Sequence, residues 1–96
     1  MSQLETIRET LKQLRHELGS KYPIQSMGLF GSVVRDDFRP ESDIDIIVEF
    51  NAPIGIGFIE LADFLESRLG KPVDLVSKKG MKPTYYKAIE AEIIYV

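Results

Sequence analysis

The chain has 96 residues, a formal net charge of −3 and no cysteine. A chain of this length supports one domain with one core, and without cysteine it has no disulfide, zinc–thiolate site or thiol chemistry. The acidic balance argues against a dedicated nucleic-acid binder, whose surface is usually strongly basic, so we expect no direct nucleic-acid binding. No segment has the pattern of a signal peptide or a membrane span, and we expect a cytoplasmic protein with no membrane contact.

Helical and strand patterns alternate along the chain. Apolar residues spaced by three and four predict a first helix from Leu4 to Leu18, a second from Gly57 to Leu69, and a shorter third that begins near Pro83. Short apolar runs predict strands at Ile24 to Phe30, Ile44 to Phe50, Val73 to Ser77 and Ile93 to Val96. This order predicts an α/β (α+β) sandwich, with helices packed on at least one face of a short mixed sheet.

Two acidic residues, Asp43 and Asp45, stand where the second apolar strand begins. Side chains alternate across a strand, so the two carboxylates project to the same side while Ile44 points to the opposite layer. Carboxylates held so close raise each other's pKa unless a cation favours the ionised form. A hard ion such as Mg²⁺ is typically held by one or two carboxylates together with substrate phosphates, and the pair is suited to that role.

A third carboxylate, Asp74, interrupts the apolar run "PVDLV". If this strand lies beside the strand of Asp45, three carboxylates meet at one edge of the sheet. Such a set could hold two metal ions, or hold one and leave a carboxylate to take a proton from an attacking hydroxyl. We therefore predict Asp43, Asp45 and Asp74 as the catalytic and metal-binding residues.

Gly31 and Ser32 follow the first strand and are predicted to bind phosphate groups. Glycine lets the backbone approach a phosphate closely, and a helix opening at Ser32 would direct its free N–H groups toward it. The serine hydroxyl adds a further donor. We therefore expect both residues in a nucleotide-binding turn.

Arg35 and Ser42 are further candidates for nucleotide binding, each with a structural alternative. Arg35 could reach the phosphates of a nucleotide or could form ion pairs with Asp36, Asp37 or Glu41. Ser42 could bind near the acidic pair or could satisfy a turn, and the turn is the favoured interpretation.

The succession of "LFGS", ten residues, "DID" and then "VDLV" behind an intervening helix resembles the nucleotidyltransferase signature of the polymerase-beta-like superfamily. The position of Arg35, the "SDIDIIV" run and the closing "IEAEIIY" extend the resemblance to the minimal nucleotidyltransferases over essentially the whole chain. The resemblance implies a single domain over residues 1–96. It also implies ATP as substrate, two Mg²⁺ ions on the three aspartates, and nucleotide phosphates on Gly31 and Ser32.

Many proteins of this family are antitoxins of HEPN ribonuclease toxins and transfer AMP from ATP to a toxin tyrosine. The resemblance therefore implies a hetero-oligomer with such a partner. Val34 and Asp36, on either side of the arginine, depart from the small residue and glycine often found in the family. The three aspartates are retained, so we expect an active enzyme. Neutralisation by binding alone and transfer to a small molecule are the alternatives.

Overall fold

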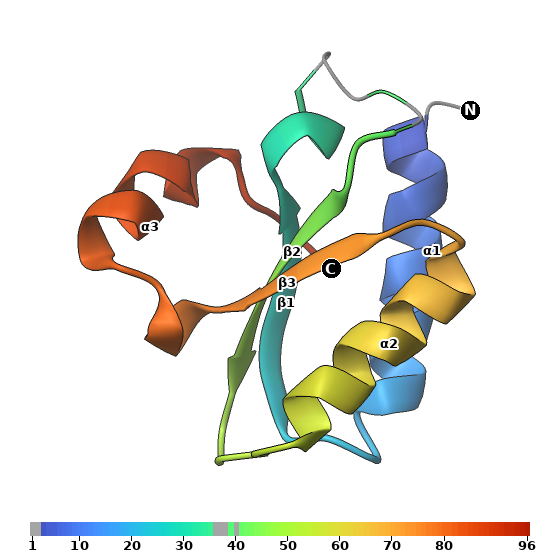
Figure 1. The fold of residues 1–96 in the computed structure, drawn as a ribbon, viewed down its shortest axis with the longest axis vertical. Coiled ribbons are helices and arrows are strands. Elements are labelled where there is room, and N and C mark those ends of the chain that lie inside the picture. Colours follow the sequence, from blue (N-terminus) through green and yellow to red (C-terminus); the bar gives the residue numbers. More distant parts are fainter. Residues whose placement is uncertain (1–2, 36–38, 40) are drawn as a thin grey trace.

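The computed structural model describes residues 3–35, 39 and 41–96. Its helices are α1 (Gln3–Leu18), α2 (Gly57–Leu69) and α3 (Pro83–Ile89). Its strands are β1 (Ile24–Phe30), β2 (Ile44–Phe50), β3 (Val73–Ser77) and β4 (Ile94–Tyr95), as Figure 1 shows. The predicted bounds of β1, β2, β3 and α2 are confirmed, and the last strand is shorter than the predicted Ile93 to Val96.

The strands form one mixed sheet in the order β3-β2-β1-β4. β1 runs antiparallel to both β2 and β4, whereas β2 and β3 are parallel. The parallel pair is joined through α2, the crossover that such a pair requires. The predicted class, an α+β fold with a short mixed sheet, is therefore confirmed.

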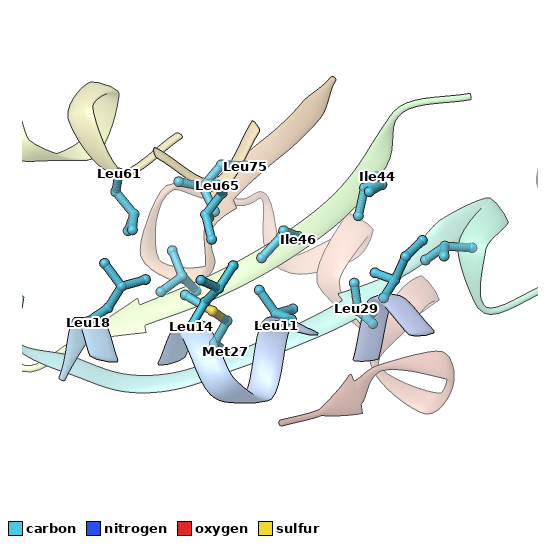
Figure 2. Packing of buried hydrophobic residues seen from close by; sticks show 13 residues of the cluster. Leu11, Leu14, Leu18, Met27, Leu29, Ile44, Ile46, Leu61, Leu65 and Leu75 are labelled. Carbon is cyan, nitrogen blue, oxygen red and sulfur yellow. The ribbon is translucent and has the colours of Figure 1, made fainter. Parts of the chain in front are cut away.

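The main core lies between the sheet and the two longer helices. α1 and α2 cover the same face of the sheet in Figure 1, and Figure 2 shows their side chains meeting those of the strands. The residues labelled there are all buried: Leu11, Leu14, Leu18, Met27, Leu29, Ile44, Ile46, Leu61, Leu65 and Leu75. The predicted apolar face of the first helix is thus the face that packs on the sheet.

A smaller apolar cluster lies on the other face, under α3. It consists of Phe30, Ile47 and Ile89, with half-buried neighbours around them. Because β2 carries buried residues toward both layers, a polar side chain on this strand is tolerated only near its ends. None of the helices in the described ranges is long and apolar enough to cross a membrane.

The predicted helix at Ser32 is wrong. Gly31–Val33 forms one 3₁₀ turn, and the N–H groups of Val34 and Arg35 both donate to the carbonyl of Gly31, at 3.1 and 3.3 Å. Two adjacent β-branched valines disfavour continuation as an α-helix. The turn therefore presents a few backbone N–H groups but not the dipole of a full helix.

Candidate active site

The predicted acidic residues and the Gly-Ser turn meet at one edge of the sheet. Phe30, the last residue of β1, is paired with Asp45 on β2, and Asp45 is in turn paired with Asp74 on β3. The N–H of Ile44 donates to the carbonyl of Pro72 at 2.9 Å, which fixes the start of β2 against the start of β3. The exit from β1 and the entries to β2 and β3 therefore lie side by side.

Gly31 lies directly against the carboxylate of Asp45. Its φ is 76°, in the left-handed region that favours glycine. A Cβ at this position would overlap the Oδ2 atom of Asp45. Glycine is required here for both reasons, and its absence of a side chain is what lets the turn approach the acidic strand.

The carboxyl group of Asp45 has a pKa raised from 3.8 to about 6. Partial burial is the main cause, followed by the negative charges of Asp74 and Asp43 and a hydrogen bond with the Asp74 side chain. The positive charge of Arg35 acts in the opposite direction. The site thus brings together carboxylates that repel one another, and a bound cation would relieve this repulsion.

Asp43 and Asp74 are exposed, whereas Asp45 is half-buried. Within residues 3–35, 39 and 41–96, no three acidic, histidine or cysteine side chains lie together as a ready-made metal cluster. The oxygen-only donors fit a hard divalent ion, and such ions commonly take only one or two carboxylates and complete their coordination with waters and substrate phosphates. The aspartates therefore suit a metal that binds together with the nucleotide.

Glu92 is part of this site and was missed from the sequence. Its Oε1 accepts a hydrogen bond from the N–H of Gly31 at 3.1 Å, and its Oε2 lies 3.6 Å from a guanidinium nitrogen of Arg35. The residue stands at the end of the 3₁₀ turn Glu90–Glu92, before β4. An acidic residue at the start of an apolar run is the same signal that identified Asp43, and it could have identified Glu92.

The structure assigns a turn to Ser42 and an ion pair to Arg35. The Ser42 hydroxyl accepts from the N–H of Arg39 at 3.2 Å, and the Ser42 N–H donates to the carbonyl of Arg39 at 2.9 Å. The favoured turn interpretation of Ser42 is thus supported. Arg35 pairs with Glu92, whereas the expected partners are Asp36, Asp37 or Glu41, of which Asp36 and Asp37 lie outside the described residues.

Ser32 and Val34, which the sequence singles out, both lie at or next to the turn. Ser32 is half-buried on the 3₁₀ turn, next to Gly31. Val34, which departs from the pattern of the family, is half-buried against the main core. Its bulk is therefore directed to packing, while Asp36 lies outside the described residues.

A mixed sheet with paired carboxylates at one edge and a glycine turn against them is the arrangement of a nucleotidyltransferase. Residues 11–96 match the family model of the nucleotidyltransferase domain, and the chain belongs to this family. It is accordingly an enzyme of the transferase class.

The relatives define the family more closely. The protein adenylyltransferase MntA of Thermococcus cleftensis is 39% identical, over 100% of this chain and 98% of its own length. A solved structure described provisionally as a minimal nucleotidyltransferase is 32% identical with a TM-score of 0.79, covering 98% of this chain and 95% of its own. A chain from the complex of a tri-AMPylated Shewanella oneidensis HEPN toxin with MNT antitoxin is 25% identical with a TM-score of 0.70. The match covers 93% of this chain and 70% of that one.

Proposed function

We propose that this protein is an antitoxin that transfers AMP from ATP to a tyrosine hydroxyl of a HEPN toxin, with Mg²⁺ as cofactor. The observation that carries the proposal is the pairing of Asp45 with Asp74 across β2 and β3, with Gly31 against the Asp45 carboxylate. The likeness to a protein adenylyltransferase and to a chain of a HEPN–MNT complex supports the acceptor and the antitoxin role.

The residues of the chain divide between holding the nucleotide and activating the acceptor. In the turn at Gly31 and Ser32, the N–H and hydroxyl of Ser32 donate to the triphosphate, and Gly31 lets the phosphates approach the backbone closely. Asp43, Asp45 and Asp74 would hold the divalent ions, two in number, which would neutralise charge on the phosphates and polarise the reacting oxygens.

The transfer itself exchanges one phosphate bond for another. The tyrosine oxygen attacks the α-phosphorus of ATP, the bond to the bridging oxygen of the β-phosphate breaks, and pyrophosphate leaves. The proton of the tyrosine hydroxyl passes to the carboxylate of Asp74, which is exposed and adjacent to Asp45. Positioning and charge neutralisation carry most of the catalysis in such a reaction.

The open acidic edge supports a protein as the acceptor. Asp43 and Asp74 are exposed at the ends of their strands, where a side chain of a second protein can reach them. A toxin and its antitoxin must meet in the same compartment, and we place this one in the cytoplasm.

The test is the double variant Asp43→Asn, Asp45→Asn with a HEPN partner, ATP labelled at the α-phosphate and Mg²⁺. Asparagine keeps the shape of both side chains and removes their charge, so transfer should fall to background while the far-ultraviolet circular dichroism spectrum is unchanged. Labelling at the normal rate by the double variant would overturn the catalytic assignment. A tight complex with an unlabelled toxin in the wild-type reaction would favour neutralisation by binding.

A further inference from the structure

One carboxylate, that of Glu92, contacts both groups expected to bind phosphate, the glycine turn and the arginine. Its two oxygens are divided between them: Oε1 accepts the Gly31 N–H at 3.1 Å, and Oε2 lies 3.6 Å from Arg35. The Glu92 side chain is 27% exposed and that of Arg35 is 56% exposed, so solvent screens the ion pair in large part, whereas the hydrogen bond with Gly31 is partly buried. These contacts join segments that are 61 residues apart in the sequence.

We infer that Glu92 is a positioning residue for nucleotide binding, which fixes the Gly31 turn and orients Arg35 toward the phosphates. This inference rests on the proposed function, since it assigns a role within the same nucleotide site. Because the Gly31 N–H donates to Glu92, it anchors the turn. The groups left to donate to phosphate are the N–H and hydroxyl of Ser32 and the guanidinium of Arg35. The guanidinium presents five N–H groups in a rigid fork, so one contact with a carboxylate restricts the direction of the whole group.

The antiparallel pairing of β4 with β1 brings Glu92 to the turn. Gly28 on β1 is paired with Tyr95, and a Cβ at Gly28 would lie 2.7 Å from the Cγ2 atom of Ile93. The side chain of Ile93 therefore occupies the space that a larger residue at Gly28 would take. Ile93 follows Glu92 directly, so the packing of the Ile93 side chain against Gly28 helps to hold the Glu92 carboxylate beside the end of β1.

A carboxylate at this place could instead compete with the phosphates for the same donors. The two roles predict opposite results. If Glu92 positions the donors, removing it weakens nucleotide binding. If it competes, removing it strengthens binding, because an anion that must be displaced is lost.

The experiment compares Glu92→Ala, Glu92→Gln and the control Glu90→Ala, which removes an exposed carboxylate from the same 3₁₀ turn. Binding of a non-hydrolysable ATP analogue with Mg²⁺ is measured by calorimetry. Glu92→Ala should weaken it about tenfold, the loss expected for one charge-assisted hydrogen bond. Glu92→Gln keeps an oxygen for Gly31 but loses the charge that holds Arg35, so its loss should be smaller, and Glu90→Ala should bind normally.

A double-mutant cycle with Arg35→Ala separates positioning from a general loss of stability. If Glu92 acts through Arg35, Glu92→Gln should weaken binding in the wild-type background and have little further effect once Arg35 is absent. With a HEPN partner, the KM for ATP should rise more than kcat falls, and the KM for the partner should not change. Glu92→Gln should melt within a few degrees of wild type, and it serves as the test if Glu92→Ala does not fold.

Unchanged or tighter analogue binding by both Glu92 variants would overturn the inference, as would fully additive losses in the cycle. A wild-type protein that binds no nucleotide would overturn both this inference and the proposed function. A wild-type protein that binds the analogue with the predicted Glu92 effects, but transfers no AMP to a HEPN partner, would contradict the proposed function alone.

Discussion

At the scale of single residues, the site depends on a glycine and an aspartate that occupy adjoining space. Gly31 adopts a positive φ and leaves room for the Asp45 carboxylate, and that carboxylate is half-buried among other negative charges. The backbone conformation is favourable for glycine, whereas the burial of Asp45 beside other carboxylates does not favour stability by itself. Repulsion of this kind is retained where a site needs it.

Gly31→Ala is expected to lower the free energy of unfolding more than Gly70→Ala. Both glycines have a φ near +70°, which costs an alanine about 1 kcal/mol. Only at Gly31 does the added methyl meet another group, the Asp45 carboxylate, whereas nothing lies within 4 Å of a Cβ at Gly70. The overlap should add a further loss of about 1–3 kcal/mol.

Urea denaturation of the two variants measures this difference, with Gly70→Ala as the matched control for backbone strain. Equal losses would show that the Asp45 carboxylate can move aside freely.

Asp45→Asn is expected to stabilise the metal-free protein above pH 6. The Asp45 carboxyl has a pKa near 3.8 when unfolded and about 6 when folded. Between about pH 4 and 6 the folded state therefore binds more protons than the unfolded state. The stability of the wild type therefore falls as pH rises from about 4 to 6 and stays lower above it. After discounting for partial exposure, the gain in the variant should be about 1 kcal/mol at pH 8 and should vanish near pH 4.

Melting temperatures in chelator across this pH range provide the measurement. Asp63→Asn, which changes an exposed carboxylate on α2, is the control and should show no such pH-dependent gain. A variant that is less stable than wild type at pH 8 would show that the Asp45 charge is already compensated without a metal.

At the scale of elements, α2 places the start of β3 and so the third aspartate. The Oε1 atom of Glu66 on α2 accepts the N–H of Val73 at 2.9 Å, and Val73 precedes Asp74. Because Glu66 is half-buried, this acceptor is shielded in part from competing water. The helix thereby holds the strand in the register that pairs Asp74 with Asp45.

Glu66→Ala should lower the free energy of unfolding by about 1–2 kcal/mol, because the Val73 N–H loses its acceptor. Glu66→Gln keeps an oxygen and should lose less. AMP transfer should fall in the same order, since Asp74 is displaced. Glu60→Ala, an exposed change on the same helix, is the control for both denaturation and activity. A larger loss of stability in Glu60→Ala than in Glu66→Ala would contradict this role.

The elements that the sequence predicts well are those with a strong local pattern. The spacing of leucines in α1 and the apolar runs of β1, β2 and β3 each reflect burial on a face that the sequence displays directly. The sequence does not distinguish the 3₁₀ turn at Gly31 from the start of a helix, because a Gly-Ser pair after a strand suits either. Glu92 carries a local signal, an acidic residue before an apolar run, but its contact with Gly31 depends on the pairing of β4 with β1, which no local pattern specifies.

At the scale of the whole molecule, the fold gathers charged groups from four segments at one open edge. Three segments carry a carboxylate: the start of β2 has Asp45, the start of β3 has Asp74, and the 3₁₀ turn before β4 has Glu92. The fourth is the turn after β1, which leads to Arg35. In the described part of the chain no complete metal cluster exists without further ligands. This arrangement supports the proposal that metal binds together with a nucleotide and that both are presented to a larger acceptor.

The most direct test of this account is the intact mass of a purified HEPN toxin after incubation with this protein, ATP and Mg²⁺. We expect the toxin to gain the mass of one or more AMP units on a tyrosine. The gain should be absent with the Asp43→Asn, Asp45→Asn variant or with chelator. A toxin that is neutralised at unchanged mass, or that gains the same mass with the double variant, would contradict it.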